Sequence, residues 1–323
     1  MKRAYGFVQV LCWAAVMVTG VNAMSETLAE RLGYGEDARL LLLHADDLGM
    51  NHSTNQGCIE VLQEGIVKSG SVMVPCPWFG EMAEFARDHP EHCIGLHLTH
   101  TAEWQHYRWG PVAGHTQVPG LVDENGFFFR GVNEVVANAS PKEIETEIRA
   151  QIEKALRYGM KPTHLDSHMG TLFADIDFLK TALRLAEEYD LPFMFFRPTP
   201  TMMERAGDRF PVELSKELEA KGWPLLDGLK SIPGDTPVAD YADAYMKLIA
   251  ELPPGVWEVI LHPAKASQEM RATTGSWLRR DAEYRVFTSP EMRDFIQAQD
   301  VHVISWKDLH PVWAEREPVR LEN

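Results

Sequence analysis

Cysteine is scarce in this sequence. Only 4 of the 323 residues are cysteines, and Cys12 lies in an apolar segment near the amino terminus. The remaining three, Cys58, Cys76 and Cys93, are an odd number, which argues against a disulfide framework, although one pair could form. Their spacing fits no zinc-binding motif. We therefore expect all three to be small buried apolar residues.

Long apolar runs are also scarce. The first is residues 7–18, which follow a basic start (Lys2 and Arg3) and precede the small-x-small sequence Val21-Asn22-Ala23. This order is typical of a signal peptide, residues 1–23. We expect cleavage after Ala23 and export to the periplasm or the exterior; an uncleaved anchor is the alternative. No later run is apolar enough to span a bilayer, so we expect no stable membrane insertion after cleavage.

Positive charge is in deficit. The chain has 31 Lys and Arg against 47 Asp and Glu, a net charge of −16. A surface of this sign repels phosphate backbones, so we expect no nucleic-acid partner, whereas a neutral sugar or peptide is compatible. The sequence also lacks a Gly-x-Gly-x-x-Gly motif after a strand and a P-loop pattern. A nucleotide cofactor therefore has no support.

The chain does contain enough apolar residues, 45% of the total, for one large core in residues 24–323. Short apolar runs alternate with amphipathic segments, which predicts an α/β fold with a parallel sheet covered by helices. We predict a distorted (β/α) barrel, with an open doubly wound sheet as the alternative. The predicted strands are residues 39–44, 71–74, 93–99, 163–166, 193–197, 228–232, 256–262 and 301–306.

A long irregular region is predicted after the third strand, from His100 to Ala139. It is rich in aromatic residues, among them Trp104, Tyr107 and Trp109. Loops of this length in a compact domain are usually functional or disordered, and the aromatic content argues against disorder. We interpret this insertion as a lid or a substrate-contacting excursion; simple packing onto the core is the alternative.

Polar side chains occur at or near the ends of five predicted strands. They are Asp46 and Asp47 after the first, His97 on the third, His164, Asp166 and His168 around the end of the fourth, Arg197 on the fifth and His262 on the seventh. The carboxyl ends of parallel strands share one rim, where barrels of this kind place catalytic groups. Two imidazoles and one carboxylate are a common catalytic metal set that leaves positions open for water and substrate. The sequence therefore predicts a metal site at this rim.

Acid–base roles at such a site would fall on two further groups. A nearby carboxylate could take a proton from water, and a cationic imidazole could protonate the leaving group. These roles suit an aspartate of the Asp46-Asp47 pair and His262. Spacing alone does not choose between the two aspartates.

Four segments carry a resemblance to a known family. They are Ala45-Asp46-Asp47-Leu48-Gly49, Val67-Lys68-Ser69-Gly70-Ser71-Val72-Met73-Val74, Gly95-Leu96-His97-Leu98-Thr99 and Thr163-His164-Leu165-Asp166-Ser167-His168. In sequence, order and interval they resemble the YdjC-like carbohydrate deacetylase family, which is related to the polysaccharide deacetylases. The resemblance implies a distorted (β/α) barrel, one divalent metal and removal of acetyl groups from N-acetylated or O-acetylated sugars, as in chitin-type oligosaccharides.

The same resemblance implies separate roles for the two aspartates. Asp47 would be a metal ligand together with His97 and His168, and Asp46 would be the general base. His262 resembles the late catalytic histidine of these enzymes. Zinc suits this ligand set best, and magnesium is the alternative.

Four further residues are candidates for support or for substrate contact. His164 and Asp166 would orient the ligands from behind. Arg197 would contact substrate or a developing oxyanion, with a salt bridge to a rim acid as the alternative. Trp109 could stack on a sugar face, with packing as the alternative.

The fourth motif departs from the family pattern. It continues as Met169-Gly170-Thr171, where many members have further histidines. The resemblance therefore does not assign the usual substrate contacts to this segment. The sequence is also compatible with two other functions: an exported metallohydrolase of another bond, such as a phosphoester, and a glycan-binding protein on an inactive barrel.

Overall fold

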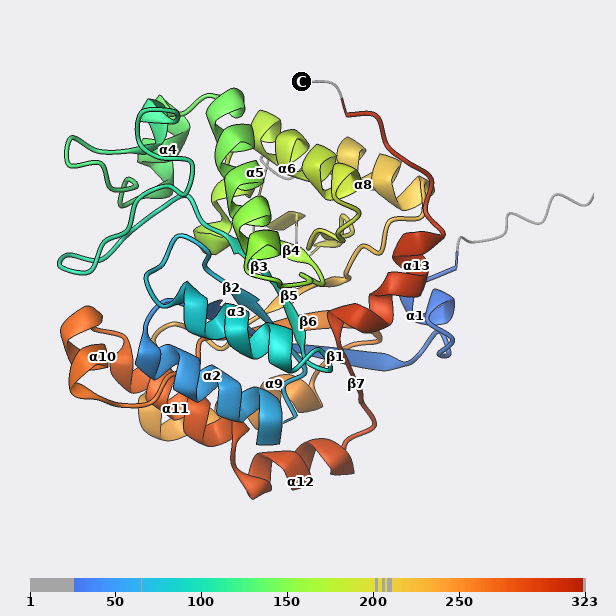
Figure 1. Ribbon diagram of the computed structural model, residues 1–323. Helices are drawn as coiled ribbons and strands as arrows, with labels where there is room; N and C mark the ends of the chain where they lie inside the picture. Colours follow the sequence, from blue (N-terminus) through green and yellow to red (C-terminus); the bar gives the residue numbers. More distant parts are fainter. Residues whose placement is uncertain (1–25, 65, 201–202, 205–206, 208–210, 322–323) are drawn as a thin grey trace, which may run out of the picture.

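The computed structural model describes residues 26–64, 66–200, 203–204, 207 and 211–321. The predicted signal peptide lies outside these residues. The described chain forms a curved sheet of parallel strands with helices packed around it (Figure 1). Within the described residues, no helix is both long and apolar enough to cross a bilayer.

Seven strands form the sheet, and every pairing between them is parallel. The order is β4-β3-β2-β1-β6-β5, and β7 pairs with the first half of β1. The strands are β1 (Arg39–Leu48), β2 (Ser69–Val72), β3 (Cys93–Leu98), β4 (Leu165–Ser167), β5 (Gly228–Lys230), β6 (Gly255–Leu261) and β7 (His302–Ile304).

Single bridges span the gap between the two ends of this sheet. Phe193 pairs with Leu165 of β4, and Phe196 pairs with Leu226, just before β5. The strand predicted for residues 193–197 is thus present only as two isolated bridges. This uneven ring confirms the predicted distorted (β/α) barrel.

Helices cover the outside of the ring. In Figure 1, α5, α6 and α8 lie above the strands, and α2, α9, α11 and α12 lie below them. The α-helices are α1 (Leu28–Arg31), α2 (His52–Glu64), α3 (Phe79–Asp88), α4 (Val132–Asn138), α5 (Pro141–Arg157), α6 (Ile176–Glu188), α8 (Val212–Ala220), α9 (Tyr241–Ala250), α10 (Gln268–Thr273), α11 (Trp277–Phe287), α12 (Pro290–Ala298) and α13 (His310–Ala314). The described 3-10 turns are η1 (Pro119–Leu121), η2 (His168–Phe173), η4 (Val238–Asp240) and η5 (Trp306–Leu309).

Helix α5 shows how local sequence sets an element. The Ser140 hydroxyl accepts from the Glu143 amide, and the Glu143 carboxylate accepts from the Ser140 amide at 2.9 Å. This capping box satisfies amides that have no partner inside the helix, and Pro141 fits the first turn. The helix accordingly begins at Pro141.

Other stretches also differ from the prediction. Strand β1 continues beyond His44 because Ala45 still pairs with Leu261 of β6. The irregular region after β3 ends earlier than Ala139, since α4 begins at Val132. Helices α10 and α11 occupy a region in which no element was predicted.

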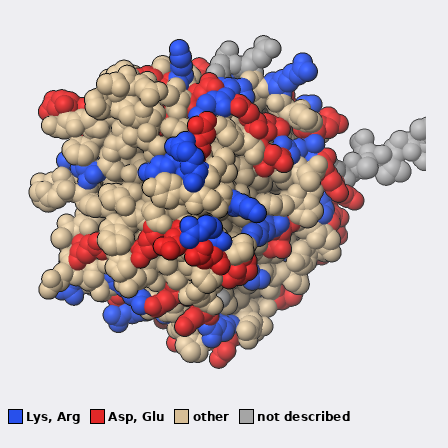
Figure 2. Space-filling model, in the orientation of Figure 1, with Lys and Arg blue, Asp and Glu red and all other residues tan. Residues whose placement is uncertain are grey.

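Charged side chains are spread over the surface. On the face drawn in Figure 2, acidic and basic groups are interspersed, so the excess of acidic residues is not gathered there into one patch. The buried interior is mainly apolar, but the inner face of the ring also holds buried histidines and carboxylates near the carboxyl ends of β1, β3 and β4.

Candidate metal centre

The two adjacent aspartates lie where β1 departs from regular geometry. The pairing of β1 with β2 shifts register between Ala45 and Leu48, and Asp47 has a positive φ of 64°. Neighbouring residues of a regular strand point to opposite faces. This irregularity instead brings both carboxylates toward His97, whose Nε2 lies 3.8 Å from Asp46 Oδ2 and 3.6 Å from Asp47 Oδ1.

The carboxylate of Asp47 is buried, and its two oxygens have different surroundings. Oδ2 accepts from Nη2 of Arg280 at 2.6 Å. Oδ1 has no hydrogen-bond partner among the described residues, although Nδ1 of His168 lies 3.4 Å away. Burial alone would raise the pKa of Asp47, but the Arg280 charge and His168 hold it well below its usual range. Asp47 is therefore an anion with one oxygen uncommitted.

His97 is held from behind. Its Nδ1 lies 2.6 Å from Asp166 Oδ1 and 3.2 Å from the Ser71 hydroxyl. Asp166 is the register partner of His97 on the neighbouring strand β4, so the sheet itself sets this contact. Nε2 of the ring consequently faces Asp47. Burial favours the neutral ring, but the Asp166 and Asp46 carboxylates raise the pKa of His97.

His168 begins η2, directly after β4, and is held in the same way. Its Nε2 lies 3.2 Å from Oε2 of Glu103, and its Nδ1 faces Asp47. The two following residues, Met169 and Gly170, have positive φ values of 54° and 62°, which turn the chain away from the rim. Burial opposes the charged ring, but Glu103 and Asp47 raise the pKa of His168 to about 10.

Three atoms therefore converge: Asp47 Oδ1, His97 Nε2 and His168 Nδ1. They belong to a group of buried side chains close enough to share one cation. Ligand atoms around a tetrahedral zinc lie roughly 3.3 Å apart, which is close to the separations of 3.4 and 3.6 Å between Asp47 Oδ1 and the two rings. An unpaired buried oxygen costs about 1–3 kcal/mol, and a carboxylate behind each histidine is the usual support of a metal site. The residues present fit a divalent cation.

Asp46 and His262 lie beside these three residues. The Oδ2 atom of Asp46 is 3.9 Å from Nε2 of His262, while its Oδ1 lies 2.7 Å from Nδ1 of His44. His262 follows β6, and its amide donates to Glu283 at 2.6 Å. Its side chain is 40% exposed, against 6% for Asp46. Asp46 is thus enclosed, while His262 reaches solvent.

His164 and Trp109 also lie near the cluster of Asp47, His97 and His168. His164 is buried below Asp166, with its Nε2 at 2.8 Å from Nε2 of His44. Trp109 is buried, donates from Nε1 to the Thr101 carbonyl at 2.9 Å, and places its ring centroid 6.4 Å from that of His168. Trp109 therefore packs beside a cluster residue and has little surface to offer a ligand.

Arg197 is not brought to the cluster. Its guanidinium pairs with Glu219 on α8 and with Asp227, 3.4 Å away. Asp227 accepts from the Val256 amide at the amino end of β6, which is the opposite end of the barrel from Asp46. We expected Arg197 beside the rim acids, and this prediction is wrong. The segment that carries it pairs with the sheet only through isolated bridges, and its side chain points toward the amino ends of the strands.

Two charged residues that contact the metal-ligand residues were not predicted from the sequence. Arg280 comes from α11, a helix whose sequence lacks a clear apolar stripe, and Glu103 comes from the irregular region after β3. Neither residue lies at the end of a strand, and the sequence analysis considered only polar residues near strand ends. His44 was also missed, although its place two residues before Asp46 on one strand puts both side chains on the same face.

Comparison with known proteins shows which family this sequence resembles. The family model described as YdjC-like protein matches residues 40–298. A carbohydrate deacetylase of Thermus thermophilus is 34% identical over 282 residues, which cover 87% of this chain and 97% of the relative. A carbohydrate deacetylase of Brevibacillus brevis is 29% identical over 269 residues, which cover 83% and 99%.

A solved structure gives the same result for the fold. A candidate cellobiose-phosphate cleavage protein from Enterococcus faecalis matches with a TM-score of 0.70 at 26% identity, and the match covers 84% of this chain and 99% of that one. The match to the family model includes the four motifs and Asp47, His97 and His168. This chain therefore belongs to the YdjC-like protein family.

Proposed function

We propose that this protein is a metal-dependent hydrolase that removes acetyl groups from acetylated carbohydrates. N-acetylated sugars are the preferred substrate class, and O-acetylated sugars are the alternative. One observation carries the proposal: the unpaired Asp47 oxygen faces His97 and His168, with the Asp46 carboxylate beside them. The relatives named carbohydrate deacetylases support the choice of substrate class.

Asp47, His97 and His168 would hold the cation. A divalent cation in such a site polarises a carbonyl oxygen and lowers the pKa of water. Two imidazoles and one carboxylate suit zinc best, and magnesium, which prefers oxygen ligands, is the alternative. Asp166 and Glu103 keep the two rings facing Asp47.

Asp46 is the proposed general base. Its Oδ1 is engaged by His44, so Oδ2, which faces His97 and His262, is the oxygen that can accept a proton from water. His262 is the proposed acid that returns a proton to the leaving amine or hydroxyl. Its half-exposed ring suits this role because the leaving sugar must stay in contact with solvent.

Substrate contacts are proposed for the aromatic residues of the segment after β3. Trp104 and Tyr107 are partly buried, with ring centroids 6.2 Å apart and planes inclined by 29°, and Arg280 lies over the Trp104 ring at 5.7 Å. Flat aromatic surfaces of this kind can pack against a sugar face. The more deeply buried Trp109 would support them from below.

Export is part of the same proposal. Residues 1–23 carry the signal-peptide pattern, and an exported enzyme would meet polymers, envelope glycans or imported oligosaccharides. Amino-terminal sequencing of the mature protein tests this. A first residue of Met24 supports export with cleavage after Ala23, and an intact first segment contradicts it.

The activity is tested by acetate release. The metal-loaded protein is incubated with acetylated chitooligosaccharides of several lengths and with O-acetylated sugars, and free acetate is measured with and without a chelator. We expect chelator-sensitive release from at least one of them. Phosphate release from a generic phosphoester without acetate release would identify a different hydrolase, and sugar binding without turnover would identify an inactive barrel.

A further inference from the structure

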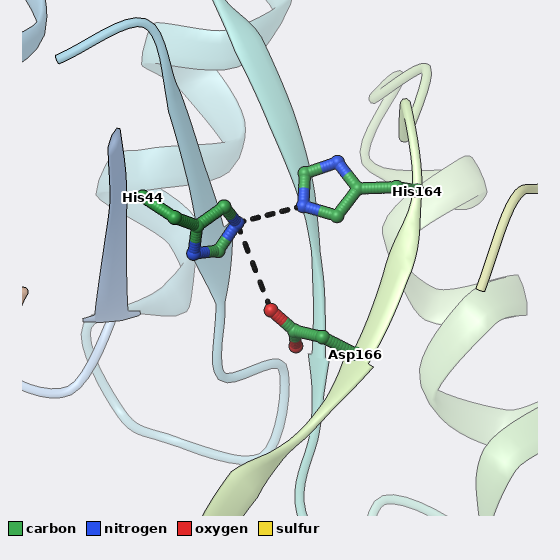
Figure 3. Close-up of side chains that lie close together, drawn as sticks. All are labelled: His44, His164 and Asp166. Carbon is green, nitrogen blue, oxygen red and sulfur yellow. Dashed lines mark hydrogen bonds and ion pairs between the residues drawn. The ribbon is translucent and has the colours of Figure 1, made fainter. Parts of the chain in front are cut away.

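His44 lies inside the barrel, directly below the proposed base. It is on β1, two residues before Asp46, and none of its surface is exposed. Figure 3 shows its ring between β1 and the β4 segment, turned toward His164 and Asp166. Its contact with Asp46 Oδ1 links it to the proposed base.

The first contact of His44 is with Asp46. Its Nδ1 lies 2.7 Å from Asp46 Oδ1, within the range of a strong charge-assisted hydrogen bond. A carboxylate is acceptor only, so the proton belongs to the imidazole. This bond occupies one oxygen of Asp46 and sets the plane of the carboxylate, which leaves Oδ2 facing His97 and His262.

The second contact of His44 is with His164. The two Nε2 atoms are 2.8 Å apart, a separation that requires a proton between them. His164 is itself fixed, because its Nδ1 lies 3.0 Å from the Thr163 hydroxyl and its ring is stacked on Trp306 at 4.9 Å. His44 is therefore held from both sides and cannot rotate without breaking a buried hydrogen bond.

Charge around His44 favours the same arrangement. Apart from Asp46 on β1, it faces Glu258 on β6 at 3.8 Å and Asp166 on β4 at 3.7 Å, as well as His164. Burial would lower the pKa of His44, but the hydrogen bond to Asp46 and these carboxylates raise it to about 9. A cationic ring here offsets part of the negative charge gathered under the rim.

We propose that His44 is the positioning residue of Asp46: its Nδ1–H holds one carboxylate oxygen so that the other stays directed at the metal-ligand cluster. The proposal rests on the proposed function in one respect, namely that Asp46 is the base. His44 would act through Asp46 and would not touch the substrate.

A second cation at His44, His164 and Asp166 is the competing explanation of this cluster. The two imidazole nitrogens are closer than two ligands of one cation normally approach, since such ligands lie roughly 3.3 Å apart around zinc. The separation of 2.8 Å is that of a hydrogen bond. We therefore assign this cluster to hydrogen bonding and expect one metal per chain.

Two variants test the proposal. His44→Asn keeps an N–H donor where Nδ1 lies, and His44→Leu removes it at similar volume. We expect His44→Leu to lower kcat roughly 10- to 100-fold with little change in KM, because the base is misplaced while substrate contacts remain. His44→Asn should recover most of the lost kcat. Both variants should still bind one equivalent of zinc.

A readout that does not depend on activity accompanies these variants. In the wild-type protein, the buried Nδ1–H of His44 should give a slowly exchanging downfield proton signal in the NMR spectrum, bonded to a histidine nitrogen. The signal should vanish in His44→Asn and shift or vanish in Asp46→Ala. Its persistence unchanged in Asp46→Ala would overturn the contact, whether or not any variant folds poorly.

The remaining outcomes separate this proposal from the proposed function. Wild-type kcat in His44→Leu, or equal loss in the Asn and Leu variants, would overturn the positioning role. Two equivalents of zinc in the wild type, one of them lost in His44→Asn, would assign the cluster to a metal instead. A wild-type protein that binds metal but releases no acetate contradicts the proposed function, and the NMR signal then decides the His44 contact alone.

Discussion

Arg280 donates from Nη2 to Oδ2 of Asp47 at 2.6 Å, and this single bond decides which oxygen of Asp47 is left for a cation. The guanidinium comes from α11, outside the strand ring, and is almost fully buried. Asp46 receives its partner from inside the barrel instead, through His44. The two adjacent aspartates are therefore distinguished by their partners: Asp47 is paired with an arginine of α11, and Asp46 is held by a histidine of β1 inside the barrel.

Replacement of Arg280 should destabilise the metal-free protein more than the metal-loaded protein. Arg280→Met removes the guanidinium that donates to Oδ2 of the buried Asp47 carboxylate, and loss of one partner of a buried ion pair typically costs about 3–5 kcal/mol of unfolding free energy. A cation bound beside Asp47 would offset part of this cost. Urea unfolding with chelator and with zinc measures both values.

Arg197→Met is the matched control, because Arg197 is also an arginine paired with carboxylate groups, those of Glu219 and Asp227, but lies away from the metal-ligand residues. Its effect should be smaller and the same with and without zinc. An equal loss of stability for Arg280→Met in the two conditions would contradict a cation at Asp47.

Metal uptake at pH 7 should release at least one proton. The pKa of His168 is raised to about 10, so its ring is protonated at pH 7 in the metal-free protein. A metal ligand must be deprotonated, and the affinity for zinc should therefore rise with pH up to about 10. Calorimetric zinc titrations at pH 7 in buffers of different ionisation enthalpy count the protons released. A binding enthalpy that is independent of the buffer would contradict the ligand role of His168.

Asp46→Asn should abolish most of the activity and leave metal binding intact. The amide keeps the shape of the side chain but cannot accept a proton from water, and loss of a general base typically costs 10²–10⁴-fold in rate. Acetate release and zinc content are measured on the same preparation. Full activity with normal zinc would show that another group is the base.

Glu147 should make stability fall as pH rises toward neutrality. Its carboxylate on α5 accepts from the Val112 and Ala113 amides at 2.9 Å each. Burial nevertheless raises its pKa from 4.5 to about 7. Below pH 4.5 the folded and unfolded forms are both protonated, and between pH 4.5 and about 7 the unfolded form ionises first. The contribution of Glu147 is therefore lost over this window, by roughly 3 kcal/mol.

The comparison that isolates this effect uses two substitutions on one helix. Glu147→Gln removes the titrating group, so its unfolding free energy should fall less between pH 4.5 and pH 8 than that of the wild type. Glu153→Gln, at an exposed position of α5, should keep the wild-type slope. Identical slopes for all three proteins would show that Glu147 does not titrate in this range.

The barrel and a metal site at its rim follow from rules that act on the sequence locally, whereas the set of Asp47, His97 and His168 came from the family resemblance. Apolar runs alternate with helices, and the carboxyl ends of parallel strands meet at one rim, so His97 and His168 could be placed beside the aspartates. The separate roles of the aspartates came only from the family resemblance. In the structure the two carboxylates lie at the irregularity after Ala45, where Asp47 has a positive φ, and no residue pattern indicated this geometry.

The partners of the cluster could not be predicted for a different reason. Arg280 and Glu103 reach it from α11 and from the segment after β3, more than 200 and about 55 residues from Asp47 along the chain. Their position depends on how those segments pack against the ring, and packing is not a local property of the sequence. Arg197 was predicted to lie at the site and does not. Its position at the end of a predicted strand did not determine the direction of its side chain.

Zinc content tests the central assignment most directly. Wild-type protein, His97→Ala, His168→Ala and a control, His92→Ala, which lies outside the cluster, are loaded with zinc, freed of excess metal by gel filtration and analysed by mass spectrometry of the metal. One equivalent is expected in the wild type and in His92→Ala, and none in His97→Ala or His168→Ala. A full equivalent retained by either cluster variant would contradict a metal centre built on Asp47, His97 and His168.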